Sequence, residues 1–111
     1  MSRPVYRRGK LHTARTAALL RLAANPALTA RQDRYVRALV QSIHEKLTER
    51  ELECMTGYYV QKYNLAELGP KLGINPSTVS RNIHRGQEKM DGLVHLAEEI
   101  SPLRWDGVLD A

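Results

Sequence analysis

The stretch LAELGPKLGINPSTVSRNIHR, residues 65–85, decides the fold of this chain. Two helices that cross tightly need a small residue where the second packs on the first, and Gly69 stands there. Four positions later, Gly73 suits a turn that requires positive φ, and Asn75 before a proline marks the start of a second helix. This spacing predicts a helix-turn-helix over about residues 65–90, the motif whose second helix enters the DNA major groove.

Apolar residues of this stretch fall on the inner faces of the two helices, and polar residues fall outside. The inward set is Leu65, Leu68, Leu72, Ile74, Val79 and Ile83. The expected DNA-binding residues are Asn75, Ser77, Thr78, Ser80, Arg81, His84 and Arg85, with Lys71 in the first helix. We expect the Arg81 guanidinium to donate two hydrogen bonds to a guanine, and the hydroxyl groups of Ser77, Thr78 and Ser80 to contact bases as well. The side chains of Arg85, His84 and Lys71 are expected to hold phosphates.

These residues carry a resemblance to a known family. TEREL (48–52), a tyrosine-containing helix and NLAELGPKLGINPSTVSRNIHRGQEKM (64–90) resemble region four of bacterial sigma factors, and are more loosely similar to the helix-turn-helix of LuxR-type regulators. The resemblance covers about residues 47–90 and implies that the second helix reads promoter DNA. The base or phosphate contacts that it implies are Ser77, Ser80, Arg81 and Arg85.

The chain departs from that family in three respects. Pro70 lies inside the first helix, and Gln87 stands where an apolar residue is common. The length of 111 residues also leaves no room for the further sigma regions that bind the polymerase and open DNA. We therefore expect a stand-alone bacterial regulator or a partial factor that needs a partner, of the kind found on phages and mobile elements.

The flanking sequence is helical by pattern. Residues 11–25 are rich in Ala, Leu and Arg and end before Pro26. Residues 29–47 form an amphipathic pattern, for which we expect Thr29 as the N-cap. Strand signals are lacking, so the predicted fold is all-α.

Two further helices complete the expected fold. Thr48 opens a capping box with Glu51, and its helix is expected to run to about Lys62. The helix that starts at Pro76 is expected to reach about Ile100. We predict four to five helices, arranged as a basic segment with a helix (1–28), a helical DNA-binding domain (29–100) and a tail (101–111).

The charge is distributed unevenly along the chain. Residues 1–37 hold nine Arg or Lys and one acid, a net charge of +8. Residues 38–111 hold eight Arg or Lys and eleven acids, a net charge of −3. An arginine-rich end is typical of polyanion binding, and a solvated arm is the alternative. A membrane surface would require large apolar residues opposite the basic face, so we expect no membrane partner. With one cysteine, Cys54, and no secretory signal, we expect a cytoplasmic protein.

Other chemistry is poorly supported. Ser80 and His84 stand one helical turn apart, but no third group would orient them, so we expect no enzyme. The four histidines lack ligand spacing, so neither a metal nor another cofactor is expected. A tyrosine group at 58, 59 and 63 is either a stacking platform or core, and core is favoured. Trp105 either folds back on the domain or docks on a partner chain.

The function that these patterns favour is sequence-specific binding of double-stranded DNA for transcriptional control. A homodimer, joined through the last helix and the tail, would supply a second half-site. Two alternatives stay open: an interaction module that binds RNA polymerase or another protein, and an architectural DNA-binding factor in recombination or excision.

Overall fold

The computed structural model describes residues 9–100 and 105–109. This part of the chain is all-α and holds five helices of eight residues or more and two of five residues. The all-α prediction is confirmed, and the five longer helices match the expected number. The helices are α1 (Lys10–Ala23), α2 (Pro26–Ala30), α3 (Arg34–Lys46), α4 (Glu49–Tyr59), α5 (Leu65–Leu72), α6 (Pro76–Ile100) and α7 (Trp105–Leu109).

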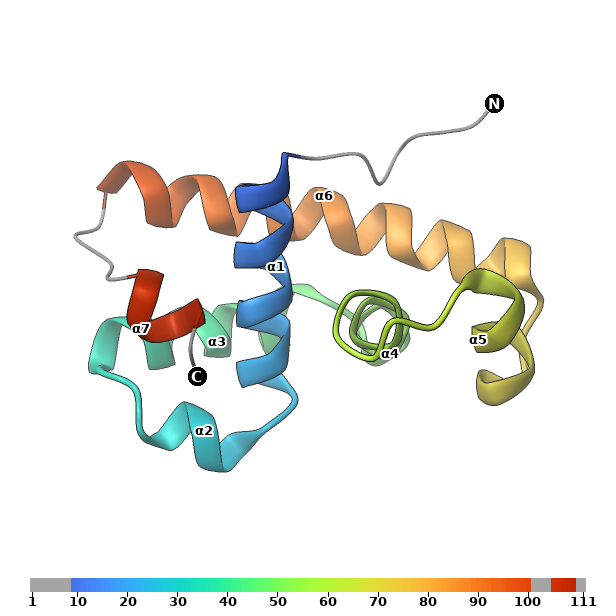
Figure 1. The fold of residues 1–111 in the computed structure, drawn as a ribbon, viewed down its shortest axis with the longest axis horizontal. Coiled ribbons are helices and arrows are strands. Elements are labelled where there is room, and N and C mark those ends of the chain that lie inside the picture. Colours follow the sequence, from blue (N-terminus) through green and yellow to red (C-terminus); the bar gives the residue numbers. More distant parts are fainter. Residues whose placement is uncertain (1–8, 101–104, 110–111) are drawn as a thin grey trace.

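The longest helix, α6, runs the length of the molecule and joins its two ends (Figure 1). Its first part packs with α5 and α4 at one end. At the other end lie α2, α3 and α7, and α1 crosses between them and contacts α4 and α6. None of the helices in the described ranges has the length and hydrophobicity that a membrane span requires.

The core is continuous between the two ends. Leu19, Leu20 and Leu22 of α1 are completely buried, as is Ile43 of α3. From α6, the fully buried apolar side chains are Val79, Ile83, Met90, Val94 and Ala97. Burial of one such side chain contributes about 1.5–3 kcal/mol. The inward positions that we predicted for α6 are therefore confirmed.

The predicted helix 29–47 with Thr29 as its N-cap is wrong. Asn25 caps the short helix α2, and Thr29 lies inside it, where its hydroxyl donates to the backbone oxygen of Leu22 at 2.5 Å. The next helix begins at Arg34, because the Asp33 carboxylate accepts the Val36 backbone N–H at 2.9 Å. The chain thus offers several capping residues in succession, and helical periodicity alone does not select among them.

The helix that starts after Thr48 begins as predicted but ends earlier. Both hydrogen bonds of the capping box with Glu51 are present. The helix ends at Tyr59 rather than near Lys62, whose φ of 67° is incompatible with a right-handed helix. Cys54, in the middle of this helix, is fully buried in the core, and burial raises the pKa of its thiol.

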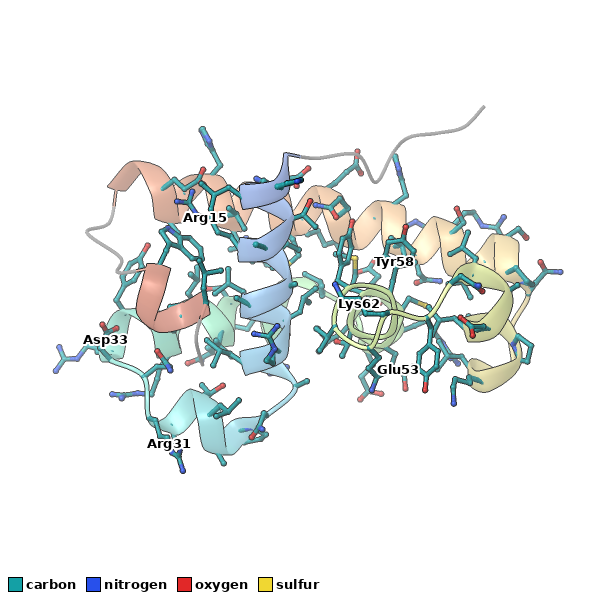
Figure 2. The ribbon with its side chains drawn as sticks, in the orientation of Figure 1. Arg15, Arg31, Asp33, Glu53, Tyr58 and Lys62 are labelled. Carbon is teal, nitrogen blue, oxygen red and sulfur yellow. The ribbon has the colours of Figure 1, made fainter. Side chains whose placement is uncertain are left out.

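The tail folds back onto the domain, as one of the two alternatives predicted. Helix α7 packs on α1, and Val108 is buried. The Arg15 guanidinium lies 4.9 Å from the centre of the Trp105 ring and also pairs with Glu98 of α6. Figure 2 shows Arg15 beside α6 and α7. These contacts connect the first and last helices of the chain.

A hydrogen-bonded chain of polar side chains also connects α4, α6 and α1. Tyr59 is 6% exposed, and its hydroxyl donates to the amide oxygen of Gln87, which is itself buried. The Gln87 amide donates to Asp91 at 2.6 Å, and Asp91 lies 2.7 Å from His12 Nε2. Gln87, unusual by the family pattern, therefore supplies a hydrogen-bond acceptor to a buried hydroxyl, which an apolar residue could not do. Tyr59 thus has a core role, as favoured.

Candidate nucleic-acid interface

The turn between α5 and α6 has the geometry that the sequence predicted. Gly73 has a φ of 70°, in the left-handed region. The Ile74 N–H donates to the Gly69 backbone oxygen at 2.9 Å and the Gly73 N–H to Pro70 at 3.3 Å, which is the hydrogen-bond pattern of a Schellman motif. Pro70 is accommodated within α5, on its exposed side.

Gly69 is required at the point where the two helices meet. A Cβ at this position would stand 2.8 Å from the backbone oxygen of Ile74 and 3.1 Å from the Pro76 ring. Since the oxygen belongs to the backbone of the turn, it cannot rotate away. The short connection therefore depends on the absence of a side chain at Gly69.

Both helices of the motif start with a side-chain cap. Asn64 and Glu67 form a capping box at the start of α5. The Asn75 side-chain oxygen accepts both the backbone N–H and the hydroxyl of Ser77, each at 2.9 Å. The side-chain oxygen of Asn75 is thus used within the cap, and the Asn75 side chain fixes the residue at which α6 begins.

The outward side of α6 carries the predicted polar residues in two groups. Ser77, Arg81, His84 and Arg85 are exposed, and we call these four residues the recognition face. Thr78 and Ser80 are half-buried at its edges. The structure therefore gathers the predicted residues of α6 on one side, but it leaves the two edge hydroxyls less accessible than Ser77.

Two contacts order the recognition face. Arg81 Nη2 donates to the Thr78 hydroxyl oxygen at 3.0 Å, which holds the guanidinium along the helix. His84 Nε2 lies 3.8 Å from a carboxylate oxygen of Glu88, one turn farther on. Glu88 is exposed and would repel phosphates, so the surface that suits an anion extends from the start of α6 to about Arg85.

Lys71 is placed apart from the recognition face. It is exposed on the last turn of α5, where its ammonium lies 4.7 Å from the centre of the Tyr63 ring. A cation held over an aromatic ring keeps free N–H groups for a second partner. Lys71 therefore keeps N–H groups for a phosphate, on the helix that precedes the recognition face.

Three supporting residues were missed by the sequence reasoning. The side-chain amide of Asn82, which is buried on α6, donates to the backbone oxygen of Thr78 at 2.9 Å. Arg50 donates to the backbone oxygen of Leu72 at 3.2 Å, where the last carbonyl groups of α5 lack helical partners. Lys89 donates to Glu51 at 2.7 Å and joins α4 to α6. Helical periodicity would have found Asn82, whereas the other two depend on tertiary packing.

Glu51 has an unusual electrostatic environment. Burial raises the pKa of its carboxyl, but the hydrogen bonds from Lys89 and from the Thr48 backbone, with the nearby charges of Lys89 and Arg85, outweigh it and bring the pKa below the ordinary 4.5. The ionised carboxylate is therefore the stable form at neutral pH. It holds α6 against α4 directly behind the recognition face.

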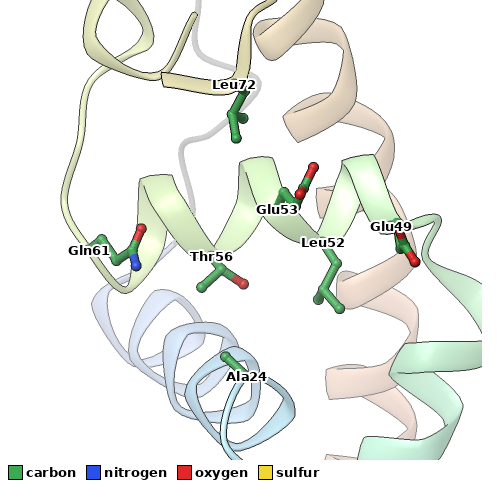
Figure 3. A pocket seen from close by; sticks show the side chains of 7 residues that line it. All are labelled: Ala24, Glu49, Leu52, Glu53, Thr56, Gln61 and Leu72. Carbon is green, nitrogen blue, oxygen red and sulfur yellow. The ribbon is translucent and has the colours of Figure 1, made fainter. Parts of the chain in front are cut away.

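A groove beside the first helix of the motif is unsuited to DNA. A groove of about 370 Å³ lies between α1, α4 and α5 and is lined by Ala24, Glu49, Leu52, Glu53, Thr56, Gln61 and Leu72 (Figure 3). Two of these side chains are carboxylates, and none of the residues comes from α6. A phosphate backbone would be repelled there, so the groove is separate from the recognition face.

Within residues 9–100 and 105–109, no three His, Cys, Asp or Glu residues are grouped as a metal ion would require. His84 of the suggested nucleophile–base pair lies near Glu88 on an exposed helix surface. Of the arginine-rich beginning, residues 1–8 lie outside the described residues.

Residues 45–90 match the family model of sigma-70, region 4. The match confirms the resemblance to sigma factors and indicates a DNA-binding helix-turn-helix domain of the sigma-factor type, which is not a known enzyme family. The looser similarity to LuxR-type regulators stays a prediction. No curated protein and no solved structure matches the chain significantly.

Proposed function

We propose that this protein is a sigma-like transcriptional regulator that binds double-stranded DNA in a sequence-specific manner through the recognition face. The observation that carries the proposal is the exposed polar and basic surface at the start of α6, on a helix fixed by the turn at Gly73 and the Asn75 cap. In the helix-turn-helix arrangement, the first residues of the second helix reach base edges. A bacterial regulator of this kind would act in the cytoplasm, and a phage or mobile element is its proposed source.

The residues have distinct proposed roles. Arg81 reads a guanine through its two parallel N–H groups, and Ser77 donates to a neighbouring base edge. Thr78 and Ser80 contribute from the edges of the face. Charged groups on both sides, Arg85, His84 and Lys71, bind phosphates, and Asn75 presents the start of α6 to the backbone.

A homodimer is the proposed binding form. Two copies related by a two-fold axis would place two recognition faces in half-sites about 34–36 Å apart. Because α7 packs on α1, the tail is already used within the chain. The dimer contact is therefore assigned to the exposed side of α6 at Leu96, which is 47% exposed.

The test is selection of binding sites from a randomised duplex pool, followed by titration of the wild type and two variants on the recovered motif. Arg81→Ala should weaken binding by about 1–3 kcal/mol and relax the preference at one base position. Arg81→Lys is the matched control. It keeps the charge but loses the two parallel N–H groups, so it should retain most affinity and lose the same preference.

A contrary result would favour the second candidate function, an interaction module for RNA polymerase. The match to sigma-70, region 4 favours that candidate, because the family model describes a part of an initiation factor. An unchanged motif preference in Arg81→Ala, or a pool without a motif and with binding that collapses steeply in salt, would contradict sequence reading. An architectural role in recombination would show the same motif, and is separated by whether transcription from an adjacent promoter changes.

A further inference from the structure

We infer that the protein has a second surface for duplex DNA, on α2 and α3, which binds phosphates outside the segment that the recognition face holds. The surface consists of Arg31, Arg34 and Arg37, and we call it the α2–α3 arginine cluster. All three side chains are exposed. The inference goes beyond the proposed function, because this surface is distinct from the helix-turn-helix.

The cluster carries an excess of positive charge, because the segment 31–37 holds three arginines and one acid. Within the described ranges, no carboxylate lies within ion-pair distance of its guanidinium groups. The one acid in the segment, Asp33, is engaged with the Val36 N–H as the N-cap of α3. Arg37 is partly ordered by a hydrogen bond to the Gln32 backbone oxygen at 2.5 Å, and keeps other N–H groups for a ligand.

The position of the cluster separates it from the recognition face. Figure 2 shows Arg31 and Asp33 at the α2–α3 end of the molecule, while α5 and the start of α6 lie at the opposite end of its long axis. That axis measures 39 Å. The two surfaces therefore contact different phosphates, either farther along one duplex or on a second duplex.

The chemistry favours DNA over two other anionic partners. A membrane surface would need large apolar side chains beside the arginines. In the described part of the chain, the exposed ones are Leu11 and Leu96, both outside α2 and α3. An acidic protein segment would use the adjacent groove of about 360 Å³, but of the three arginines only Arg37 lines it. Three guanidinium groups, spread from the C-cap of α2 to the first turn of α3, fit an extended row of phosphates instead.

The experiment compares duplexes of 12 and 30 base pairs, both centred on the selected motif. At about 3.4 Å per base pair, the shorter duplex reaches roughly 20 Å from its centre and the longer roughly 51 Å. The wild type should bind the longer duplex with a steeper salt dependence. Each neutralised phosphate adds about 0.9 to the slope, so three arginines add up to about 2.7.

The variant Arg31→Gln/Arg34→Gln/Arg37→Gln should lose that additional slope and bind the 12-base-pair duplex as the wild type does. The matched control is Arg31→Lys/Arg34→Lys/Arg37→Lys. It keeps the charge and should retain most of the additional salt slope on the longer duplex. Capture of a second labelled duplex by protein bound to an immobilised one shows whether the second site takes a separate duplex. If no second duplex is captured, but the wild type and the glutamine variant still differ in salt slope, the arginine cluster binds the same duplex as the recognition face.

Equal slopes for the wild type and the glutamine variant on the longer duplex would overturn the inference and leave an acidic protein as the partner. The outcome is independent of the proposed function. If the random pool returns no motif, a mixed-sequence duplex of 30 base pairs replaces the selected one. The glutamine variant must then still lose slope relative to the lysine variant, and an equal slope overturns the inference there too.

Discussion

The helix-turn-helix end and the α1–α3 end of the molecule are packed by different means. At the first, helices approach through glycines: a Cβ on Gly57, Gly69 or Gly86 would stand 2.5, 2.8 or 2.7 Å from a neighbouring atom. At the second, contacts are made by aliphatic side chains, such as Leu19 and Ile43, both fully buried. Where helices approach closely, few residue types fit at the contact. A core volume, in contrast, can be filled by many combinations of apolar side chains.

The match to the family model falls on the end that is packed through glycines. The matched segment, residues 45–90, contains all three close-packed glycines and the turn at Gly73. Helices α1 and α2 and most of α3 lie outside it. Yet those helices supply a large part of the buried core, so the recognisable end depends on the unrecognised one for its stability.

The largest loss of stability is expected for a substitution of Leu20 in α1, which is 0% exposed. Leu20→Ala should destabilise the protein by about 2–5 kcal/mol, since it removes apolar contacts and leaves a cavity. Because α1 packs on both α4 and α6, both ends should unfold in one transition. Urea unfolding, followed by circular dichroism and by Trp105 fluorescence, measures both quantities.

The control for that variant is Leu11→Ala, because Leu11 is on the same helix and 54% exposed. It should change the unfolding free energy by less than about 0.5 kcal/mol. Two separate transitions, with helical signal remaining after the Trp105 change is complete, would show that the two ends are independent.

The close approach at the other end is tested by Gly69→Ala. The added methyl group should cost about 1–3 kcal/mol, because the Ile74 backbone oxygen cannot move away without distorting the turn. Gly92→Ala is the matched control: this glycine is in α6 with no atom within 4 Å of a Cβ, and alanine is the better helix former. Thermal unfolding of both variants compares them. A stable Gly69→Ala protein would show that the turn adapts.

The smallest of the three effects concerns the Glu51–Lys89 pair behind the recognition face. Glu51→Gln should lower the unfolding free energy at pH 7 by about 1–2 kcal/mol, because the lysine is partly exposed and water screens the pair. Since the folded-state pKa of Glu51 is below 4.5, its contribution is present above pH 4.5 and is lost as the pH falls through that lower value. The difference from the wild type should therefore shrink in acid.

Urea unfolding at a series of pH values between neutral and strongly acidic measures this convergence. Glu53→Gln, which alters an exposed carboxylate on the same helix, should change the unfolding free energy little at any pH. A difference for Glu51→Gln that stays constant down to the most acidic stable condition would contradict the assigned pKa direction.

Local signals predicted the parts of the fold that local geometry controls. The caps at Thr48 and Asn75 and the turn at Gly73 could be predicted, because each depends on residues within a few positions. The start of α3 was not, since Asn25 and Asp33 are both good caps and the choice between one long and two shorter helices is made by packing on α1.

Contacts between distant positions could not be predicted in the same way. His12 meets Asp91, 79 positions away, and Lys89 meets Glu51, 38 positions away. Nothing in the spacing of these residues indicates a pair. The recognition face, in contrast, was predictable because it lies on one helix, where period and burial determine which side chains point outward.

Because α6 is one uninterrupted helix, a small rotation at one of its ends produces a large displacement at the other. Twenty-five residues extend about 37 Å at 1.5 Å per residue, so a tilt of about 5° at the α1–α7 end displaces the other end by about 3 Å. That displacement is as large as a hydrogen bond is long. A ligand or protein that shifts α7 against α1 would thus displace the start of α6 at the far end of the molecule.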